Sequence, residues 1–210
     1  MKLKTLFTLF FLTLLKGCSS EKCTCPLDNE TLRENIESFK EIEKSDSWTE
    51  LGLENYRTFK NDTYRLTIYP SWKDSKISEY KLENGWGSPK ISINHYERMD
   101  YKEKNQLKKI GKTEKISLSE NEWNQFDKLM REQCFWTMPV RSKSMYLDGT
   151  GWILEVKKGR KNRCTNQNYH IVSRVADSPE YFDLCDKLLK LANSSKREQD
   201  SLLYDSWTSD

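Results

Sequence analysis

The chain has 210 residues, a length that suits one domain with terminal extensions. Its 35 basic and 32 acidic residues give a formal charge of +3, and Lys2, Lys4 and Lys16 at the N-terminus account for all of that excess. The rest of the chain is therefore neutral, which argues against nucleic-acid binding. The 7 Trp, 10 Tyr and 8 Phe supply bulky core material and argue against disorder throughout.

The N-terminus has the parts of a secretory signal peptide. Lys2 and Lys4 precede an uncharged, apolar run over residues 5–15, and Lys16 ends that run. A run this short cannot cross a hydrocarbon layer of about 30 Å as a lasting helix. A basic start, a short apolar segment and a small residue before a cleavage site are typical of a signal peptide, so we expect residues 1–17 to be removed.

The expected cleavage site reads Leu15-Lys16-Gly17-Cys18. It resembles the lipobox of bacterial lipoproteins, in which a leucine and a small residue precede an invariant cysteine; Lys16 stands where that family usually has an uncharged residue. The resemblance implies that Cys18 becomes the first mature residue and carries a diacylglycerol, with a further fatty acid such as palmitate on its amine. Two or more acyl chains hold a protein stably to a membrane.

The lipobox also implies a place in the cell. We expect a lipid-anchored protein of the cell envelope, and Ser19 resembles the residues that permit sorting to the outer membrane in some Gram-negative bacteria. Downstream of the signal, the chain divides into a lipidated tether over residues 18–27, one domain over residues 28–194 and a polar tail over residues 195–210.

The cysteines indicate a disulfide rather than a metal site. Lipidation of Cys18 leaves five others in an oxidising compartment, where disulfides persist. Cys23 and Cys25 fall in the tether, and we expect a structural disulfide between two of the remaining three, without a choice of pair: Cys134, Cys164 and Cys185. Because no CxxC pair is accompanied by a second cysteine or histidine pair, the spacing does not fit zinc.

Hydrophobic periodicity predicts a helix followed by strands. After a cap at Asp28 or Asn29, apolar residues fall at helical spacing on a face expected to dock on the core: Leu32, Ile36, Phe39 and Ile42. Residues 64–69, 76–82 and 90–96 read as strands, with an Asn84-Gly85 turn before the third. We expect residues 97–114 to wander over the surface and residues 115–118 to form a short strand.

The best-marked helix begins after Ser119. Ser119 and Glu122 form an S-x-x-E capping box, and Leu118 and Trp123 are placed for a hydrophobic staple. Farther on, strands over residues 152–156 and 169–175 are expected to pair as a hairpin, and Ser178-Pro179 opens the last helix. The order predicts an α+β fold, with an antiparallel sheet of about five to six strands and two to three helices on one face.

A candidate binding patch lies on and beside the expected hairpin: Asp148, Trp152, Glu155, His170 and Arg174. In one register Glu155 and Arg174 would share a face and form an ion pair. The simpler interpretation is a turn aspartate, a core tryptophan and a cross-strand pair worth at most about 1 kcal/mol. The basic loop over residues 157–163 is either a solvated hairpin tip or a contact for anionic lipid headgroups.

The same stretch carries a second resemblance. Asp148-Gly149-x-x-Trp152-x-Leu154-Glu155, then Tyr169-His170-x-Val172, Arg174 and Ser178-Pro179, resembles a pattern in small, uncharacterised bacterial secreted proteins and lipoproteins. It covers roughly the last third of the chain and implies a fold unit without an activity.

No catalytic motif accompanies the two histidines, His95 and His170. Neither lies in a recognisable nucleophile motif, so we expect no catalytic residue, cofactor or metal. The leading hypothesis is a membrane-tethered, non-enzymatic binding module with an unknown envelope protein as partner. The alternative is an envelope hydrolase whose site is assembled from His170, Glu155 and Asp148. A third hypothesis, a structural subunit, would require a large exposed aromatic patch.

Overall fold

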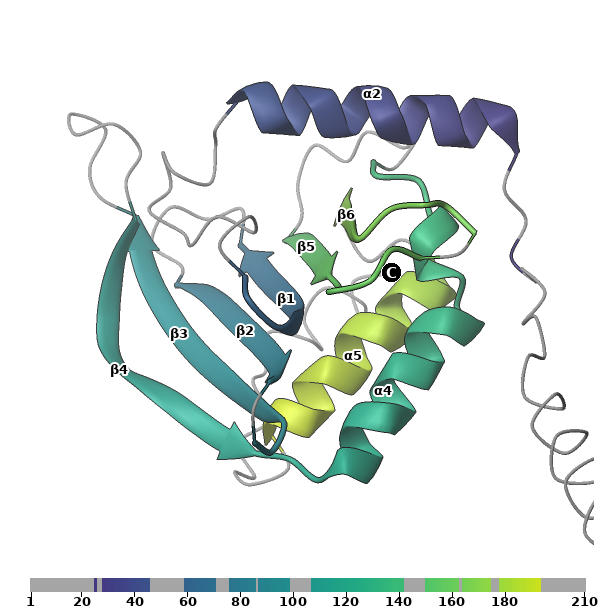
Figure 1. Cartoon of the computed structure of the whole chain (residues 1–210). Coiled ribbons are helices and arrows are strands. Elements are labelled where there is room, and N and C mark those ends of the chain that lie inside the picture. Colours follow the sequence, from purple (N-terminus) through teal and green to yellow (C-terminus); the bar gives the residue numbers. More distant parts are fainter. Residues whose placement is uncertain are drawn as a thin grey trace, which may run out of the picture.

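The computed structural model describes residues 25, 28–45, 59–70, 76–85, 87–98, 107–141, 150–162, 164–174 and 178–193. These residues form three α-helices, a 3₁₀ helix and one antiparallel six-stranded sheet, which confirms the predicted α+β class (Figure 1). In chain order the elements are α2 (Asn29–Ser45), β1 (Asp62–Tyr69), β2 (Ile77–Asn84), β3 (Lys90–Arg98), β4 (Leu107–Ser117), α4 (Glu120–Glu132), η3 (Phe135–Thr137), β5 (Gly151–Lys157), β6 (Tyr169–Arg174) and α5 (Pro179–Asn193).

The strands lie in the order β4-β3-β2-β1-β5-β6, so β1 is central, with β2 on one side and β5 on the other. The expectation that residues 97–114 wander over the surface is wrong for residues 97–98, which end β3, and for residues 107–114, which belong to the long edge strand β4. Residues 99–106 lie outside the described residues. The lysine-rich composition of β4 does not resemble that of a buried strand. An edge strand needs few apolar residues, and lysines there discourage pairing with other chains.

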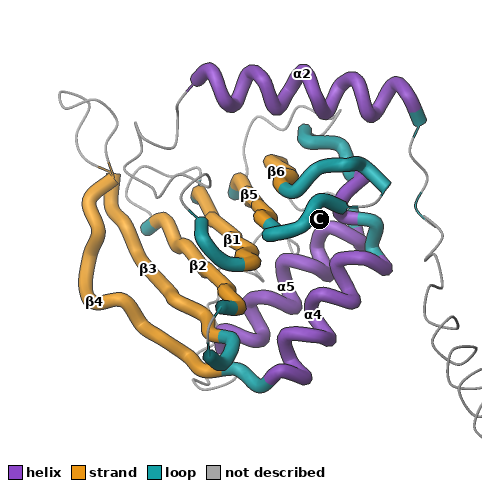
Figure 2. The backbone as a smooth tube through the Cα atoms, in the orientation of Figure 1, coloured by secondary structure: helices purple, strands orange, loops and turns teal. Residues whose placement is uncertain are grey.

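The main core lies between the sheet and the helices α4 and α5, which run side by side over one face (Figures 1 and 2). The predicted capping box is present: Ser119 Oγ accepts from Glu122 N at 3.2 Å, and the Glu122 carboxylate accepts from Ser119 N at 2.8 Å. The two residues of the predicted staple, Leu118 and Trp123, are both buried. The residues around Ser119 therefore predicted correctly where α4 begins.

The opposite face of the sheet carries a second, smaller cluster of buried apolar residues: Phe59, Ile77, Tyr96, Val140, Tyr169 and Ile171. Helix α2 lies apart from α4 and α5 (Figure 1). Asn35 docks it: its Nδ2 donates to Met138 O at 3.1 Å, and its Oδ1 accepts from Val140 N at 2.9 Å. Of the four residues expected on the docking face, Ile36 is 38% exposed and Leu32 is half-buried, while the side chains of Phe39 and Ile42 lie outside the described part of the structure.

Candidate functional site

The residues of the predicted patch lie on two different faces of the sheet. In the β5–β6 register Trp152 is opposite Arg174 and Val156 is opposite His170, so these side chains share the face covered by α4 and α5. Glu155 is opposite Ile171 and projects to the other face. The ion pair between Glu155 and Arg174 is therefore not formed, and Asp148 lies outside the described residues.

Arg174 contacts the start of α5. Its guanidinium carbon lies 4.8 Å from the centre of the Tyr181 ring, and its Nη2 lies 3.5 Å from Ser178 Oγ. Ser178 Oγ also accepts from Tyr181 N at 3.3 Å, which is the cap that the Ser178-Pro179 signal predicts. Arg174 thus joins β6 to the first turn of α5.

His170 is an interior residue. It is 3% exposed, and its Nε2 lies 3.0 Å from Met138 O. Since that carbonyl can only accept, the ring donates through Nε2. The Phe135 ring lies 5.1 Å away, centre to centre, and burial lowers the pKa of His170 from 6.5 to about 4 against the weaker effect of the Met138 hydrogen bond. The ring is therefore neutral near pH 7 and is enclosed by η3.

Glu155 belongs to a buried ionic cluster on the other face. Its Oε2 accepts from Arg65 Nε at 2.6 Å and its Oε1 accepts from Tyr169 OH at 2.7 Å. Glu79 Oε2 lies 3.7 Å from Arg65 Nη1. The cluster continues to β3, because Glu79 Oε1 accepts from Asn94 Nδ2 at 2.8 Å and from Tyr96 OH at 3.2 Å. The cluster thus connects side chains from five adjacent strands, β3, β2, β1, β5 and β6.

Sequence reasoning found only Glu155 of this cluster. A sign was present in β1, where Thr63, Arg65 and Thr67 alternate with apolar residues and would face water in a sheet covered on one side only. All three are fully buried, so the sheet has two covered faces. A shallow hollow of about 560 Å³ lies elsewhere, lined by Asn61, Asp62, Asn84 and Gly85. The ionic cluster thus acts as a fixed part of the interior.

A second ion network joins the β5–β6 loop to α4. Lys158 Nζ lies 2.7 Å from Asp127 Oδ1 and 3.3 Å from Asp62 Oδ2. The ammonium also lies 4.5 Å from the centre of the Tyr64 ring and 4.9 Å from that of Trp123, a cation–π arrangement. Partial burial alone would raise the pKa of Asp127, but Lys158 and Tyr64 hold it below its ordinary value. Lys158 is thus a structural member of the basic loop.

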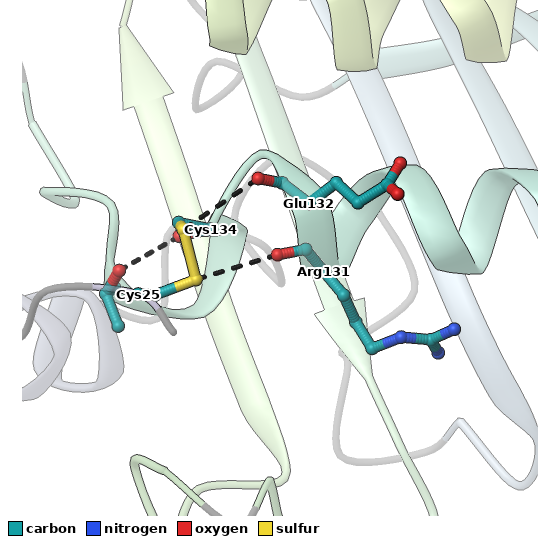
Figure 3. Close-up of a disulfide and its surroundings, with 5 residues drawn as sticks. Cys25, Arg131, Glu132 and Cys134 are labelled. Carbon is teal, nitrogen blue, oxygen red and sulfur yellow. Dashed lines mark hydrogen bonds between the residues drawn. A yellow bond between two sulfur atoms is a disulfide. The ribbon is translucent and has the colours of Figure 1, made fainter. Parts of the chain in front are cut away.

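The disulfide differs from the expected one. Cys25 is bonded to Cys134, just after α4 (Figure 3), while Cys185 is buried and free. Cys164 is also disulfide-bonded. None of Cys134, Cys164 and Cys185 therefore pairs with another of the three. The expectation failed because it placed Cys25 in a free tether, whereas Cys25 Sγ lies 3.6 Å from Arg131 O, against the end of α4.

Ser78 and His95 form one further pair of chemical interest. They are directly opposite each other on β2 and β3, and Ser78 Oγ lies 3.0 Å from His95 Nδ1. A hydrolytic serine–histidine pair also needs a carboxylate that orients the ring. No carboxylate contact to His95 occurs in the described part of the chain, so the pair reads as a cross-strand hydrogen bond.

No protein-family model and no curated protein matches the chain. Within the described ranges, no cluster of three or more His, Cys, Asp or Glu side chains could hold a metal ion. No helix in those same ranges is long and apolar enough to cross a membrane.

Proposed function

We propose that this protein is a lipid-anchored lipoprotein of the cell envelope, and that its domain is a non-enzymatic binding module for an envelope protein. The Cys25–Cys134 disulfide is the observation that carries the first half of the proposal. Structural disulfides persist in oxidising compartments and are rare in the cytosol. This supports the export that the signal peptide and the lipobox at Cys18 imply.

The same disulfide bears on how the domain would sit at a membrane. Cys18 and Cys25 are seven positions apart, and seven extended residues reach at most about 25 Å. Because Cys25 is covalently joined to the end of α4, a lipid on Cys18 would hold the domain close to the bilayer. A partner in the same membrane would then meet the domain within this short reach.

The placement of the ionisable groups favours a binding module over the hydrolase alternative. That alternative needs Glu155, His170 and Asp148 to converge. Glu155 is engaged by Arg65 and Tyr169, while His170 lies on the opposite face and donates to a backbone carbonyl. In the described part of the chain, neither side chain reaches the surface to meet a substrate.

Metabolic labelling with an alkyne-bearing palmitate, followed by membrane fractionation, tests the lipid anchor. The wild-type chain is expected to take up label and to sediment with membranes, and the variant Cys18→Ser is expected to lose the label. Ser20→Ala is the matched control and should behave as wild type. Equal labelling of Cys18→Ser and Ser20→Ala would refute lipidation at Cys18.

Affinity purification of the lipidated protein from detergent-solubilised envelopes tests the binding role. We expect a partner in stoichiometric amount that is retained by the folded wild-type domain and lost after urea denaturation. A Cys18→Ala variant shows whether capture depends on the anchor. Capture of no partner would contradict the binding role and turn attention to hydrolase assays with a His170→Ala variant.

A further inference from the structure

One corner of the domain combines exposed basic side chains from two elements. Lys128 and Arg131 lie on the last turns of α4, with side chains 66% and 54% exposed. Arg160 and Lys161 lie in the β5–β6 loop and are exposed. We refer to these four residues as the basic corner.

Contacts hold the two halves of the basic corner together and join them to Cys25. Lys158, at the base of the loop, is bound to Asp127 of α4, and Asp127 also pairs with Arg131. Arg131 O in turn lies 3.6 Å from Cys25 Sγ (Figure 3). The loop, the end of α4 and the point where the N-terminal segment joins the domain are thus one continuous patch.

The charge of this patch is positive. The acidic side chains within it are already paired: Asp127 and Asp62 with Lys158, and Glu132 with Lys128. Arg160 and Lys161 have no carboxylate partner in the described ranges. The patch contains five basic and three acidic side chains, whereas the mature chain as a whole is neutral.

We infer that the basic corner faces the membrane and binds anionic phospholipid headgroups, an inference that rests on the proposed lipid anchor at Cys18. Cys25 lies against Arg131 of the corner, and because Cys18 is only seven positions away, the lipid would keep Cys25 within about 25 Å of the bilayer. Salt screens the attraction between opposite charges beyond a Debye length, about 8 Å at physiological ionic strength. The basic side chains nearest to the bilayer are therefore attracted most strongly to an anionic surface. The lipid then limits the distance between the domain and the bilayer, and the basic corner sets which side of the domain faces the bilayer.

The test uses the full lipidated protein inserted into vesicles of phosphatidylcholine, with or without phosphatidylglycerol. A water-soluble amine-acylating reagent labels the lysines, and peptide mass spectrometry gives the rate at each. We expect phosphatidylglycerol to slow labelling of Lys128 and Lys161 by about fivefold, the scale of one basic residue at an anionic surface. Lys108 and Lys112, exposed on β4 at the far edge of the sheet from β6, are the internal controls and should not change.

Charge-neutral variants give a second, independent readout. Arg160→Gln/Lys161→Gln should weaken partitioning of the lipidated protein into phosphatidylglycerol vesicles, whereas Lys108→Gln/Lys112→Gln should leave it unchanged. Equal labelling of all four lysines on both vesicles would overturn the inference, and so would equal protection on both, since headgroup charge would then play no part. The mass of the N-terminal peptide reports separately on the anchor: an unacylated Cys18 would refute the proposed function, whatever the lysines show.

Discussion

Arg65 on β1 and Glu155 on β5 are directly opposite each other, and their side chains form a salt bridge of 2.6 Å between Nε and Oε2 with both fully buried. Burial alone would lower the pKa of Arg65, but Glu155 and Glu79 hold it above its ordinary value, so the guanidinium remains charged. Tyr169 OH completes the hydrogen bonding of Glu155. The pair therefore links the centre of the sheet to its β5–β6 half.

Removal of one partner should be costly. Glu155→Ala leaves the buried guanidinium without its closest carboxylate, and breaking a buried pair in this way costs about 3–5 kcal/mol of unfolding free energy. Glu132→Ala, which breaks the exposed pair with Lys128, is the matched control and should cost at most about 1 kcal/mol. Urea denaturation of the oxidised protein measures both. Similar losses in the two variants would contradict a special role for the buried pair.

The pH dependence of stability should reveal His170. Because burial lowers its folded pKa to about 4 from 6.5, the unfolded chain binds the proton first as the pH falls. Its contribution is fully present above about pH 6.5 and is lost towards pH 4, a loss of about 3 kcal/mol in total. His170→Gln keeps a donor for Met138 O and has no proton to gain. We expect the variant to lack this part of the acid destabilisation; parallel wild-type and variant curves over that window would contradict the buried, neutral ring.

The features that the sequence predicted correctly are local ones. The capping box of Ser119 and Glu122, the cap at Ser178 and the β5–β6 hairpin each depend on residues close in the chain. The features it missed join distant residues. Arg65 and Glu155 are 90 positions apart, and Cys25 and Cys134 are 109 apart. Only the pairing of β1 with β5 decides which residue meets Glu155, and nothing in the neighbourhood of Glu155 specifies that pairing.

The face on which each residue of a hairpin projects follows from register, which the sequence left open. A shift of one residue moves every side chain to the other face. To bring Glu155 and Arg174 onto one face, one of the two strands would have to turn over, which would take either Leu154 and Val156 of β5 or Val172 of β6 out of the main core. All three residues are fully buried there, and their burial decides against the ion pair.

The Cys25–Cys134 disulfide should contribute to stability through the unfolded state. It closes a loop of about 109 residues, for which loss of chain entropy predicts about 4–5 kcal/mol. Cys25→Ser/Cys134→Ser removes the cross-link without leaving an odd thiol to pair elsewhere, and its loss in urea denaturation should fall in this range. Each single variant should lose about as much as the double. Single losses that add up to the double loss would show that the two residues act separately.

The partner of Cys164 links the disulfides to the proposed anchor. Cys25, Cys134 and Cys185 are accounted for, so the sequence leaves Cys18 and Cys23 as intramolecular partners. A sulfur that carries a diacylglycerol is a thioether and cannot enter a disulfide. If Cys18 is lipidated as proposed, we therefore expect Cys164 to pair with Cys23.

Peptide mass spectrometry of the unreduced protein, isolated from membranes, decides between the two partners. A cross-linked peptide that contains Cys23 and Cys164 is the expected result, together with an acylated peptide that begins at Cys18. Cys23→Ser should then release a free thiol at Cys164, detected by alkylation without reduction, whereas Ser20→Ala should not. A Cys18–Cys164 peptide as the main species would contradict lipidation, because the same sulfur atom cannot serve both bonds.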